Sequence, residues 1–351
     1  HTDLQKIGKQ MDDFVRKNYA LQEGTVKAAH PFHNELVQAY KKDVKAYRYG
    51  DFTLLLPGSV LLTSGSVKAF SLENISGSYW KGDSNNQMLQ RITGHAFKSE
   101  QDLKNFLETL AAAQERDHRK IGKELGLFQF DELSPGSPFI LPKGTIIYNE
   151  LLRFLREQYR QRGYQEVITP QMFNKALWEQ SGHWQHYKEN MFVLPVDNTE
   201  FALKPMNCPS HLLIYNSTIH SYRDLPLRIA DFCFLHRNEV RGTLGGMTRV
   251  RKMSQDDAHI FLMMDQIEAE IERMLDFVAY IYTQVFKFSF SLDLSTKPEK
   301  ALGDASLWEK AEQILKKSLE QSKLPYKIST GEGAFYGPKI DIHIKDSQNR
   351  D

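Results

Sequence analysis

The stretch "LHRNEVRGTLGGMTRVR", residues 235–251, carries four arginines and a single carboxylate, whereas the whole chain is almost neutral, with 45 Lys and Arg against 44 Asp and Glu residues. We call residues 237–251 the arginine loop. The planar arginine side chain can bind phosphate through two parallel hydrogen bonds. Four arginines near one turn between two strands therefore favour a polyphosphate or a nucleic-acid backbone as ligand. A solvated hairpin with surface charge is the alternative.

Glu239 moves this balance towards a nucleotide. A carboxylate two residues after Arg237 can accept a hydrogen bond from an adenine amino group while Arg237 contacts the α-phosphate. The chain contains neither the GxxxxGKS/T nor the GxGxxG phosphate-binding pattern. A nucleotide would therefore be bound by arginine side chains and not by a glycine-rich loop.

Composition excludes several classes of protein. The 351 residues suggest two or three domains, and 41% hydrophobic with 25% charged residues is ordinary for a globular protein. No stretch approaches the roughly 20 apolar residues that cross a bilayer, and no signal peptide opens the chain, so we expect no membrane partner. Two cysteines, Cys208 and Cys233, fit a reducing compartment or a metal role for one of them. We expect a cytoplasmic protein, with an organellar matrix as the alternative.

The pattern of strands and helices predicts an α+β fold. Short strands outnumber helices in the C-terminal part and are joined by hairpin-like loops, which favours a mostly antiparallel sheet backed by helices. We expect a small α+β domain over residues 1–98, a linker helix over 99–124 and a larger domain over 125–351. Further helices are expected at 2–17, 32–47, 145–162, 266–285 and 306–322, and strands at 191–195, 201–204, 227–235, 248–253, 258–263, 288–295 and 339–346.

Several blocks resemble the class II aminoacyl-tRNA synthetases. "FLHRNE" (234–239) is similar to motif 2, whose core is Arg-x-Glu on a strand before a variable loop, and "RGYQEVITPQMF" (162–173) is similar to motif 1. More specific blocks, in one order, resemble the threonyl-tRNA synthetase family: "KPMNCPSH" (204–211), "SYRDLPLRIADF" (221–232), "RVRKMSQDDAHIF" (249–261), "LSTKPEK" (294–300) and "GAFYGPKIDIHIKD" (333–346). The likeness runs from about residue 44 to the end. It implies a class II antiparallel sheet flanked by helices, and a threonine–tRNA ligase that forms threonyl-adenylate from ATP and transfers threonine to tRNA(Thr).

The resemblance assigns roles in ATP chemistry. It places Arg237 on the α-phosphate, Glu239 on adenine and Arg249 on the β- and γ-phosphates of ATP, which is bound with Mg2+. Lys339 and His183 match catalytic positions around the adenylate and in the transfer step. By the alternative interpretations, Lys339 blunts a strand edge and His183 caps a turn.

A second group of residues resembles the threonine pocket of the family. Cys208 and His259 match two of the three protein ligands of a catalytic zinc, which keeps a coordination position open for substrate. Threonine can chelate such a zinc through its amino and hydroxyl groups, whereas valine lacks the hydroxyl. The other pocket positions that match are Met206, Gln255, Tyr336 and Asp257, the last as acceptor for the threonine hydroxyl. Taken singly, four of these residues have a structural alternative. Cys208 could be a buried thiol and His259 a core imidazole, while Met206 could be core filler and Tyr336 a turn aromatic.

Departures from the family pattern limit these expectations. The chain ends at Asp351, before motif 3 with its ATP-binding arginine, and the third zinc ligand and the anticodon-binding domain are also expected beyond that end. Leu56 and Val60 stand where the family's editing domain has Cys and His, so we expect no editing by residues 1–98. Gly245 replaces a usual histidine in the arginine loop, which leaves the tRNA contact open. We therefore expect a piece of a longer enzyme, or an inactive chain.

Three functions remain as hypotheses. Threonine–tRNA ligase leads, and a catalytically inactive synthetase-like fragment or RNA- or partner-binding module is the alternative. A class II synthetase for serine or proline fits less well, because "NCPSH" and "DDAHIF" together pair a thiol with an imidazole. Motif 1 around Pro170 predicts a homodimer.

Overall fold

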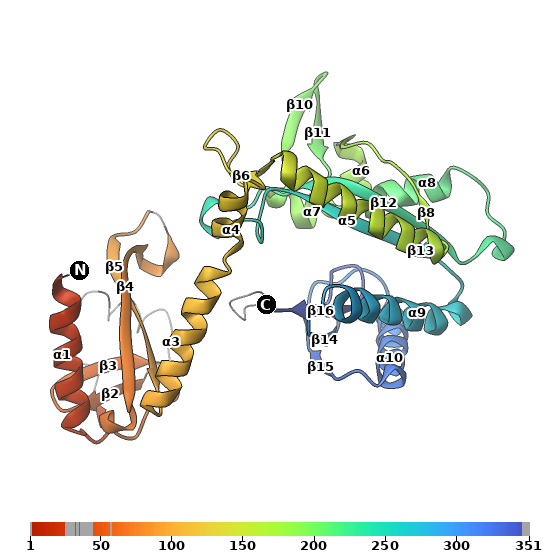
Figure 1. Ribbon diagram of the computed structural model, residues 1–351. Coiled ribbons are helices and arrows are strands. Elements are labelled where there is room, and N and C mark those ends of the chain that lie inside the picture. The colour runs from red at the N-terminus through yellow and green to blue at the C-terminus, as the bar shows by residue number, and fades with distance from the viewer. Residues whose placement is uncertain are drawn as a thin grey trace. The chain divides into compact units, whose positions relative to one another are not determined.

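The computed structural model describes residues 2–24, 32, 35, 45–56, 58–83 and 85–345. The chain divides into two compact units, His1–Ala113 and Gln114–Asp351, and each is described by itself. Helices and mostly antiparallel strands make up both units (Figure 1), which confirms the predicted α+β class. Among the described residues, no helix combines the length and apolar character required to cross a bilayer.

The smaller unit consists of a three-stranded sheet, a long hairpin and two helices. Its elements are α1 (Thr2–Arg16), β1 (Gln22–Gly24), β2 (Lys45–Tyr49), β3 (Phe52–Leu56), β4 (Ala69–Tyr79), β5 (Met88–Phe97) and α3 (Glu100–Glu115), with 3-10 helices at Ser64–Ser66 and Trp80–Gly82. The sheet has the antiparallel order β1-β2-β3, and β4 pairs with β5. The expected helix 2–17 is confirmed. The expected helix 32–47 lies mainly outside the described residues, and its last positions are wrong, since residues 45–47 belong to β2.

Aromatic side chains hold the smaller unit together. Phe14 on α1 packs edge-on against Tyr49 of β2 at 6.5 Å between ring centroids and against Phe52 of β3 at 6.0 Å. Phe106 of α3 packs on Phe97 of β5 at 5.1 Å, so α3 covers one face of the hairpin. Each such pair adds about 0.5–1.5 kcal/mol to the burial of its apolar area.

The predicted linker helix forms two helices. After α3 ends at Glu115, Asp117 adopts extended backbone angles (φ −60°, ψ 122°) and begins α4 (His118–Leu125) as its N-cap. The Asp117 side chain accepts a hydrogen bond of 2.8 Å from the Arg119 amide. An aspartate that caps a helix adopts extended backbone angles, and these angles end the preceding helix. This explains the break between α3 and α4.

The larger unit contains several small sheets and several helices. Its elements after α4 are β6 (Phe128–Gln129), β7 (Phe139–Ile140), α5 (Pro142–Gln161), β8 (Gln165–Glu166), β9 (Met172–Asn174), α6 (Lys175–Gln180), α7 (His183–Tyr187), β10 (Val193–Val196), β11 (Thr199–Leu203), α8 (Cys208–Asn216), β12 (Leu227–His236), β13 (Lys252–Phe261), α9 (Ile267–Ala279), the π-helix Tyr280–Val285, β14 (Phe290–Ser295), α10 (Ala305–Ser322), β15 (Tyr326–Ser329) and β16 (Lys339–Ile344). The helices expected at 145–162, 266–285 and 306–322 are confirmed within a few residues. The strands expected around 191–195, 201–204, 227–235, 288–295 and 339–346 are confirmed as well.

The arginine loop connects β12 to β13, which pair over ten residues without a bulge, from Leu227↔Phe261 to His236↔Lys252. The prediction of separate strands at 248–253 and 258–263 is therefore wrong. The consecutive carboxylates at 256 and 257 do not interrupt the strand, because the two side chains point to opposite faces and each finds a donor there. Tyr159 donates to Asp256 at 3.0 Å, and Asn207 donates to Asp257 at 3.0 Å.

Helix α5 covers one face of the β12–β13 ribbon, as Figure 1 shows. The hydroxyl of Tyr148 contacts that of Ser254 at 2.9 Å, and Tyr159 packs edge-on against Phe232 at 5.2 Å. Proline at the start of α5 suits a position whose backbone N–H would be unpaired in any case. The helix ends before Gly163, whose φ of +79° favours glycine.

The C-terminal part packs its own three-stranded sheet, in the order β15-β14-β16, against α9 and α10. Its core is aliphatic and is formed by Ile271, Leu275, Leu292, Leu294 and Leu319. An ion pair joins it to the β12–β13 ribbon, because Arg228 of β12 contacts Glu270 of α9 through two hydrogen bonds of 2.5 and 2.6 Å.

Candidate active site

Strand alternation brings three of the expected site residues onto one face. Gln255, Asp257 and His259 are two residues apart on β13, so their side chains share the face away from α5. Cys233 of β12 is the direct neighbour of Gln255 across the ribbon and points the same way. This face is therefore polar, whereas the opposite face packs on the aromatic residues of α5.

Helix α8 places its first turn against this polar face. Asn207 donates from Nδ2 to Oδ2 of Asp257 at 3.0 Å and to the Cys233 sulfur at 3.1 Å. One turn along, Nδ1 of His211 lies 2.7 Å from Nδ1 of His259, so one of these two nitrogens carries the shared hydrogen. We call Asn207, Cys208, His211, Asp257 and His259 the polar cluster.

Burial controls the charge of the polar cluster. It raises the pKa of the Cys208 thiol to about 11, and the negative charge of Asp257 adds to this rise. Burial lowers the pKa of His211 to about 4, with a further contribution from the neighbouring His259. The pKa of His259 is also lowered by burial, although Asp257 acts in the opposite direction. At neutral pH the thiol is thus protonated and both imidazoles are neutral, which leaves imidazole nitrogens free to accept a proton or bind a metal.

Arg237 and Tyr336 lie beside the polar cluster. Arg237 follows β12 directly, and its Nε donates to the carbonyl oxygen of Pro205 at 3.4 Å, three residues before Cys208. The pKa of the Tyr336 hydroxyl is raised mainly by partial burial, with smaller effects of Cys208 and Asp257 in the same direction and of Arg237 in the opposite one. The bond to Pro205 places Arg237 next to the segment that carries Cys208 and that contacts Asp257 through Asn207.

Glu239 and Arg249 form an ion pair within the arginine loop. Arg249 donates from Nε to Oε2 of Glu239 at 3.0 Å, and its Nη2 lies 2.9 Å from the same oxygen. Arg249 is 58% exposed and Glu239 is 16% exposed, so the arginine can turn towards a ligand while the carboxylate stays in place. Arg251 donates from Nε to the backbone oxygen of Glu239 at 3.0 Å and so fixes the base of the loop.

Met206 and Gln255 flank the same region. Met206 is half-buried and stands between Pro205, which accepts from Arg237, and Asn207 of the polar cluster. Gln255 contacts the sulfur of Met253 at 3.8 Å, a weak interaction that leaves its amide oxygen free of hydrogen bonds within the described residues.

His183 and Lys339 have other partners. His183 is buried, its Nδ1 lies 2.9 Å from the Ser181 hydroxyl, and its Nε2 has no hydrogen-bond partner among the residues that the structure describes. Lys339 contacts both carboxylate oxygens of Asp341, at 2.5 and 2.7 Å. Within the described residues neither side chain makes a hydrogen bond to the polar cluster. His183 is linked to Tyr336 by aromatic packing alone, through Phe335.

Sequence reasoning missed His211 and the buried network behind it. Lys204, which is completely buried, donates to the Thr169 hydroxyl at 2.6 Å and lies 3.3 Å from Asp231. Nε2 of His211 lies 4.0 Å from the same Asp231 carboxylate. The spacing of Cys208 and His211, one helical turn apart, was a signal for the imidazole. Nothing in the sequence pointed to the Lys204–Asp231 pair, because the two residues are 27 positions apart and are brought together by elements of two different sheets.

The donor set suits zinc in kind but is incomplete. A thiol and an imidazole are typical zinc ligands, and Cys208 and His259 approach the same polar face. In the described part of the chain, no three His, Cys, Asp or Glu side chains are grouped so that they could hold a metal ion.

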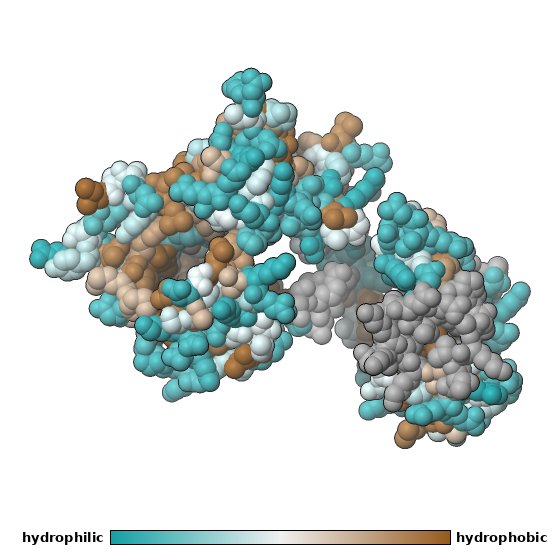
Figure 2. Space-filling view, turned by 180° about the vertical axis from the view of Figure 1, so that it is seen from behind, coloured by the Kyte–Doolittle hydropathy of each residue, from teal (hydrophilic) through white to brown (hydrophobic). Residues whose placement is uncertain are grey.

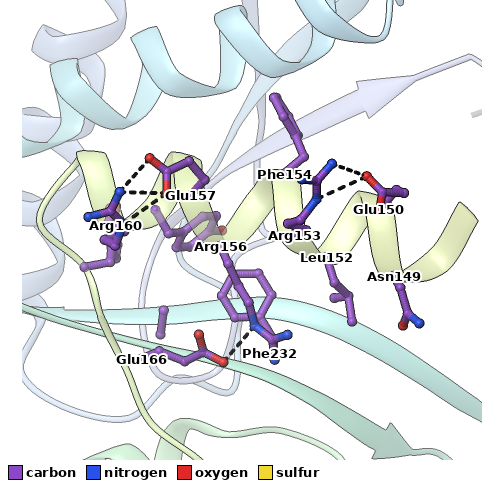
Figure 3. A pocket seen from close by; sticks show the side chains of 13 residues that line it. Asn149, Glu150, Leu152, Arg153, Phe154, Arg156, Glu157, Arg160, Glu166 and Phe232 are labelled. Atoms are coloured by element: carbon purple, nitrogen blue, oxygen red, sulfur yellow. Dashed lines mark hydrogen bonds and ion pairs between the residues drawn. The ribbon is translucent and has the colours of Figure 1, made fainter. Parts of the chain in front are cut away.

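A separate cavity of about 990 Å³ lies on the α5 side of the ribbon (Figure 3). Phe232, whose side chain points away from the polar cluster, forms part of its wall. Figure 3 shows three arginines of α5, each paired with a glutamate: Arg153 with Glu150, Arg156 with Glu166 and Arg160 with Glu157. The cavity therefore belongs to the α5 face and not to the candidate active site.

Comparisons with known proteins agree with the motifs. Residues 192–351 match the family described as tRNA synthetase class II core domain (G, H, P, S and T). Across 99% of its length the chain is 48% identical to threonine–tRNA ligase 2 of Bacillus subtilis and 48% identical to threonine–tRNA ligase of Thermotoga petrophila. The chain belongs to the threonyl-tRNA synthetase family. It spans 56% of the length of each of these two relatives.

Solved structures of threonyl-tRNA synthetases share the fold. The structure of the RNA binding domain of the threonyl-tRNA synthetase from Cryptosporidium parvum aligns with a TM-score of 0.65 and 50% identity, covering 67% of this chain and 58% of that one. A putative threonyl-tRNA synthetase from Aeropyrum pernix aligns with a TM-score of 0.56 and 30% identity, covering 60% of this chain and 49% of that one. Membership of the threonyl-tRNA synthetase family thus rests on sequence and on fold.

Proposed function

We propose that the protein containing this chain is a threonine–tRNA ligase, with ATP, threonine and tRNA(Thr) as substrates. The observation that carries the proposal is the position of Arg237, which donates to the Pro205 oxygen three residues before Cys208, beside the cluster in which Asn207 donates to Asp257. A phosphate-binding guanidinium beside a pocket of small polar groups is what activation of a hydroxyl-bearing amino acid requires.

In the first step a carboxylate oxygen of threonine attacks the α-phosphorus of ATP, and pyrophosphate leaves with Mg2+. Arg237 is held by its bond to Pro205 and would stabilise the charge that develops on the α-phosphate. Glu239 would accept from the adenine amino group, and Arg249 would meet the β- and γ-phosphates. Their ion pair keeps both groups on the same part of the loop, where a bent nucleotide could contact both.

Asp257 is the proposed determinant for the substrate hydroxyl. Its Oδ2 accepts from Asn207, whereas its Oδ1 makes no hydrogen bond within the described residues and can accept from threonine. Valine would leave this half-buried acceptor unpaired, and an unpaired polar group discriminates more strongly than a missing methyl group. Met206 and Gln255 border the same space, and Tyr336 would close it.

We further propose that Cys208 and His259 supply two of three zinc ligands, with the third expected beyond Asp351. Bound zinc would supply a Lewis acid for the amino and hydroxyl groups of threonine. Thiolate formation is opposed by burial in the chain alone, so zinc affinity is expected to rise with pH. Zinc content of the purified full-length protein, measured with Cys208→Ser as the comparison, tests this independently of activity.

In the second step the 3′-terminal ribose hydroxyl of tRNA(Thr) attacks the adenylate carbonyl, and AMP leaves. We assign His183 to this step and Lys339 to the adenylate; the unpaired Nε2 of His183 supports its availability for a proton. Leu56 ends β3 and Val60 lies in the following loop, and neither residue type can carry out hydrolytic editing. We place the reaction in the cytoplasm, which the bacterial origin of the relatives supports.

A homodimer through α5 and the region of Pro170 is proposed as the assembly. Apolar residues interrupt the hydrophilic surface of the larger unit (Figure 2). Among the exposed ones are Ile146 (65%) and Ile147 (50%) of α5 and Ile168 (90%), two residues before Pro170. Light scattering of the full-length protein tests this assembly, and replacement of Ile147 by Glu is expected to shift it to the monomer.

The decisive experiment is ATP–pyrophosphate exchange with threonine, valine and serine on the full-length protein. Arg237→Ala is expected to lower the exchange rate about 100- to 1000-fold. Arg241→Ala is the matched control, since it lies in the same loop and makes no hydrogen bond from its side chain in the described residues, and it should keep near-parental exchange. Exchange that is absent from the parent protein, with tRNA binding retained, would support the inactive RNA-binding module instead.

A further inference from the structure

The first residue of helix α4 contacts the tip of the arginine loop. The backbone amide of Met247 donates to Nε2 of His118 at 2.9 Å. Since Nε2 accepts, the imidazole hydrogen is on Nδ1, which lies 3.8 Å from a carboxylate oxygen of Asp117. The contact joins residues 129 positions apart in the sequence, so local structure alone does not produce it.

Glycine at 246 makes this contact possible. Gly246 has a φ of +51°, and a Cβ atom there would lie 2.4 Å from Nε2 of His118 and 3.0 Å from Cγ of Arg119. Any other residue at 246 would displace the imidazole from the position in which it accepts the Met247 hydrogen bond. Gly246 therefore has a packing role in the loop.

The tip is connected to the phosphate-binding arginine by a tight turn. The Arg249 amide donates to the Gly245 oxygen at 3.2 Å, the Gly245 amide donates back to Arg249 at 3.1 Å, and the Thr248 hydroxyl donates to Gly245 at 2.6 Å. Met247 lies within this closed turn, two residues from Arg249. The base of the loop is held separately by Arg251, whose amide donates to the oxygen of Gly136 at 2.6 Å.

We propose that His118 is a positioning residue of the synthetase reaction: by accepting the Met247 hydrogen bond it holds the tip of the arginine loop and so keeps Arg249 beside Glu239. His118 itself does not touch the substrate. The role in catalysis rests on the proposed function, whereas the hold on the loop does not. With α4 at one end and Gly136 at the other, the loop is fixed at its tip and at its base before ATP arrives.

The test uses the full-length protein with His118→Ala and His118→Gln. Glutamine can place an amide oxygen near the position of Nε2, so it restores the acceptor, whereas alanine removes it. Hydrogen exchange of the Met247 amide is expected to become about three- to tenfold faster in His118→Ala, the range for one net hydrogen bond, and to return most of the way in His118→Gln. The KM for ATP should rise by a similar factor in His118→Ala, with little change in kcat.

The control is Lys120→Ala, which removes another polar side chain from α4, one that pairs with Glu115 at 2.7 Å and not with the loop. It should leave Met247 exchange unchanged. Unchanged exchange in His118→Ala, or equal effects of alanine and glutamine, would overturn the proposal. If exchange follows the prediction while the parent protein lacks ATP–pyrophosphate exchange, the hold on the loop stands and the proposed catalytic function fails.

Gly246→Ala gives an independent check. Its added methyl group should speed Met247 exchange in the parent background, because it occupies the place of Nε2 of His118. In the His118→Ala background the same substitution should increase the exchange rate of the Met247 amide by a smaller factor, since the hydrogen bond is already absent. Full additivity of the two effects would contradict the geometry.

Discussion

Removal of Arg228 is expected to weaken the junction between the β12–β13 ribbon and the C-terminal part. Arg228 is 14% exposed and Glu270 is 6% exposed, and two hydrogen bonds of 2.5 and 2.6 Å join them. Arg228→Met leaves the Glu270 carboxylate buried without its main partner. Breaking a buried pair costs about 3–5 kcal/mol. Because Arg273 remains 3.4 Å from the same carboxylate, we expect the low end, about 3 kcal/mol at pH 7.

The stability lost in Arg228→Met should depend on pH in a defined direction. Hydrogen bonds from Arg228 lower the pKa of Glu270 below its ordinary value of 4.5. A depressed carboxylate pKa contributes stability that is fully present above the ordinary value and is lost as the pH falls through the folded-state pKa. The stability difference between Arg228→Met and the parent should therefore be largest near neutral pH and shrink as the pH falls towards the lowered folded-state pKa, at which the paired carboxylate becomes neutral.

Urea denaturation followed by tryptophan fluorescence, at pH 7 and at pH 4, measures both effects. Arg273→Met is the matched control, since it removes the exposed partner of the same carboxylate and should cost less than about 0.5 kcal/mol. Arg228→Met combined with Glu270→Met should recover most of the loss, because no buried charge remains. A loss below about 1 kcal/mol at pH 7, or a loss that grows as the pH falls, would refute the reasoning.

Three other substitutions test the site and its support. Lys204→Met leaves the buried Asp231 carboxylate without its ammonium partner and should destabilise the protein by about 3 kcal/mol, as measured by urea denaturation. Gly144→Ala would place a Cβ atom 2.0 Å from the Leu127 carbonyl oxygen and should lower the melting temperature although alanine favours helices. Asp257→Ala should remove most of the preference for threonine over valine in ATP–pyrophosphate exchange, and an unchanged preference would exclude it as the hydroxyl acceptor.

Sequence patterns predicted the elements better than their ends and junctions. The helix expected at 266–285 and the strand expected at 288–295 were predicted correctly, although the last four residues of β14 are buried on both faces of the strand. The helix break at Asp117 was missed because only this residue changes from helical to extended backbone angles, and the residues on both sides of it are helical. The division of β13 was wrong because carboxylates 256 and 257 are satisfied by Tyr159 and Asn207, which are distant in the sequence.

The sequence by itself determined which residues could carry out the chemistry. The block order and the identities of Arg237, Cys208 and His259 placed the chain in a family before any contact was known. Because strands were expected at 248–253 and 258–263, the sequence did not place Gln255 and Asp257 on the same strand as His259, and it could not say which face of the ribbon would be covered by α5 and which by α8.

Only the tertiary structure decided that question and the electrostatics that follow from it. The contacts of Asn207 with Asp257 and of His211 with His259 join residues 50 and 48 positions apart. The raised pKa of Cys208 and the lowered pKa of His211 arise from burial in that arrangement. The physical reason is that desolvation and strand pairing depend on residues far away in the chain, whereas motifs and periodicity report on neighbours in sequence.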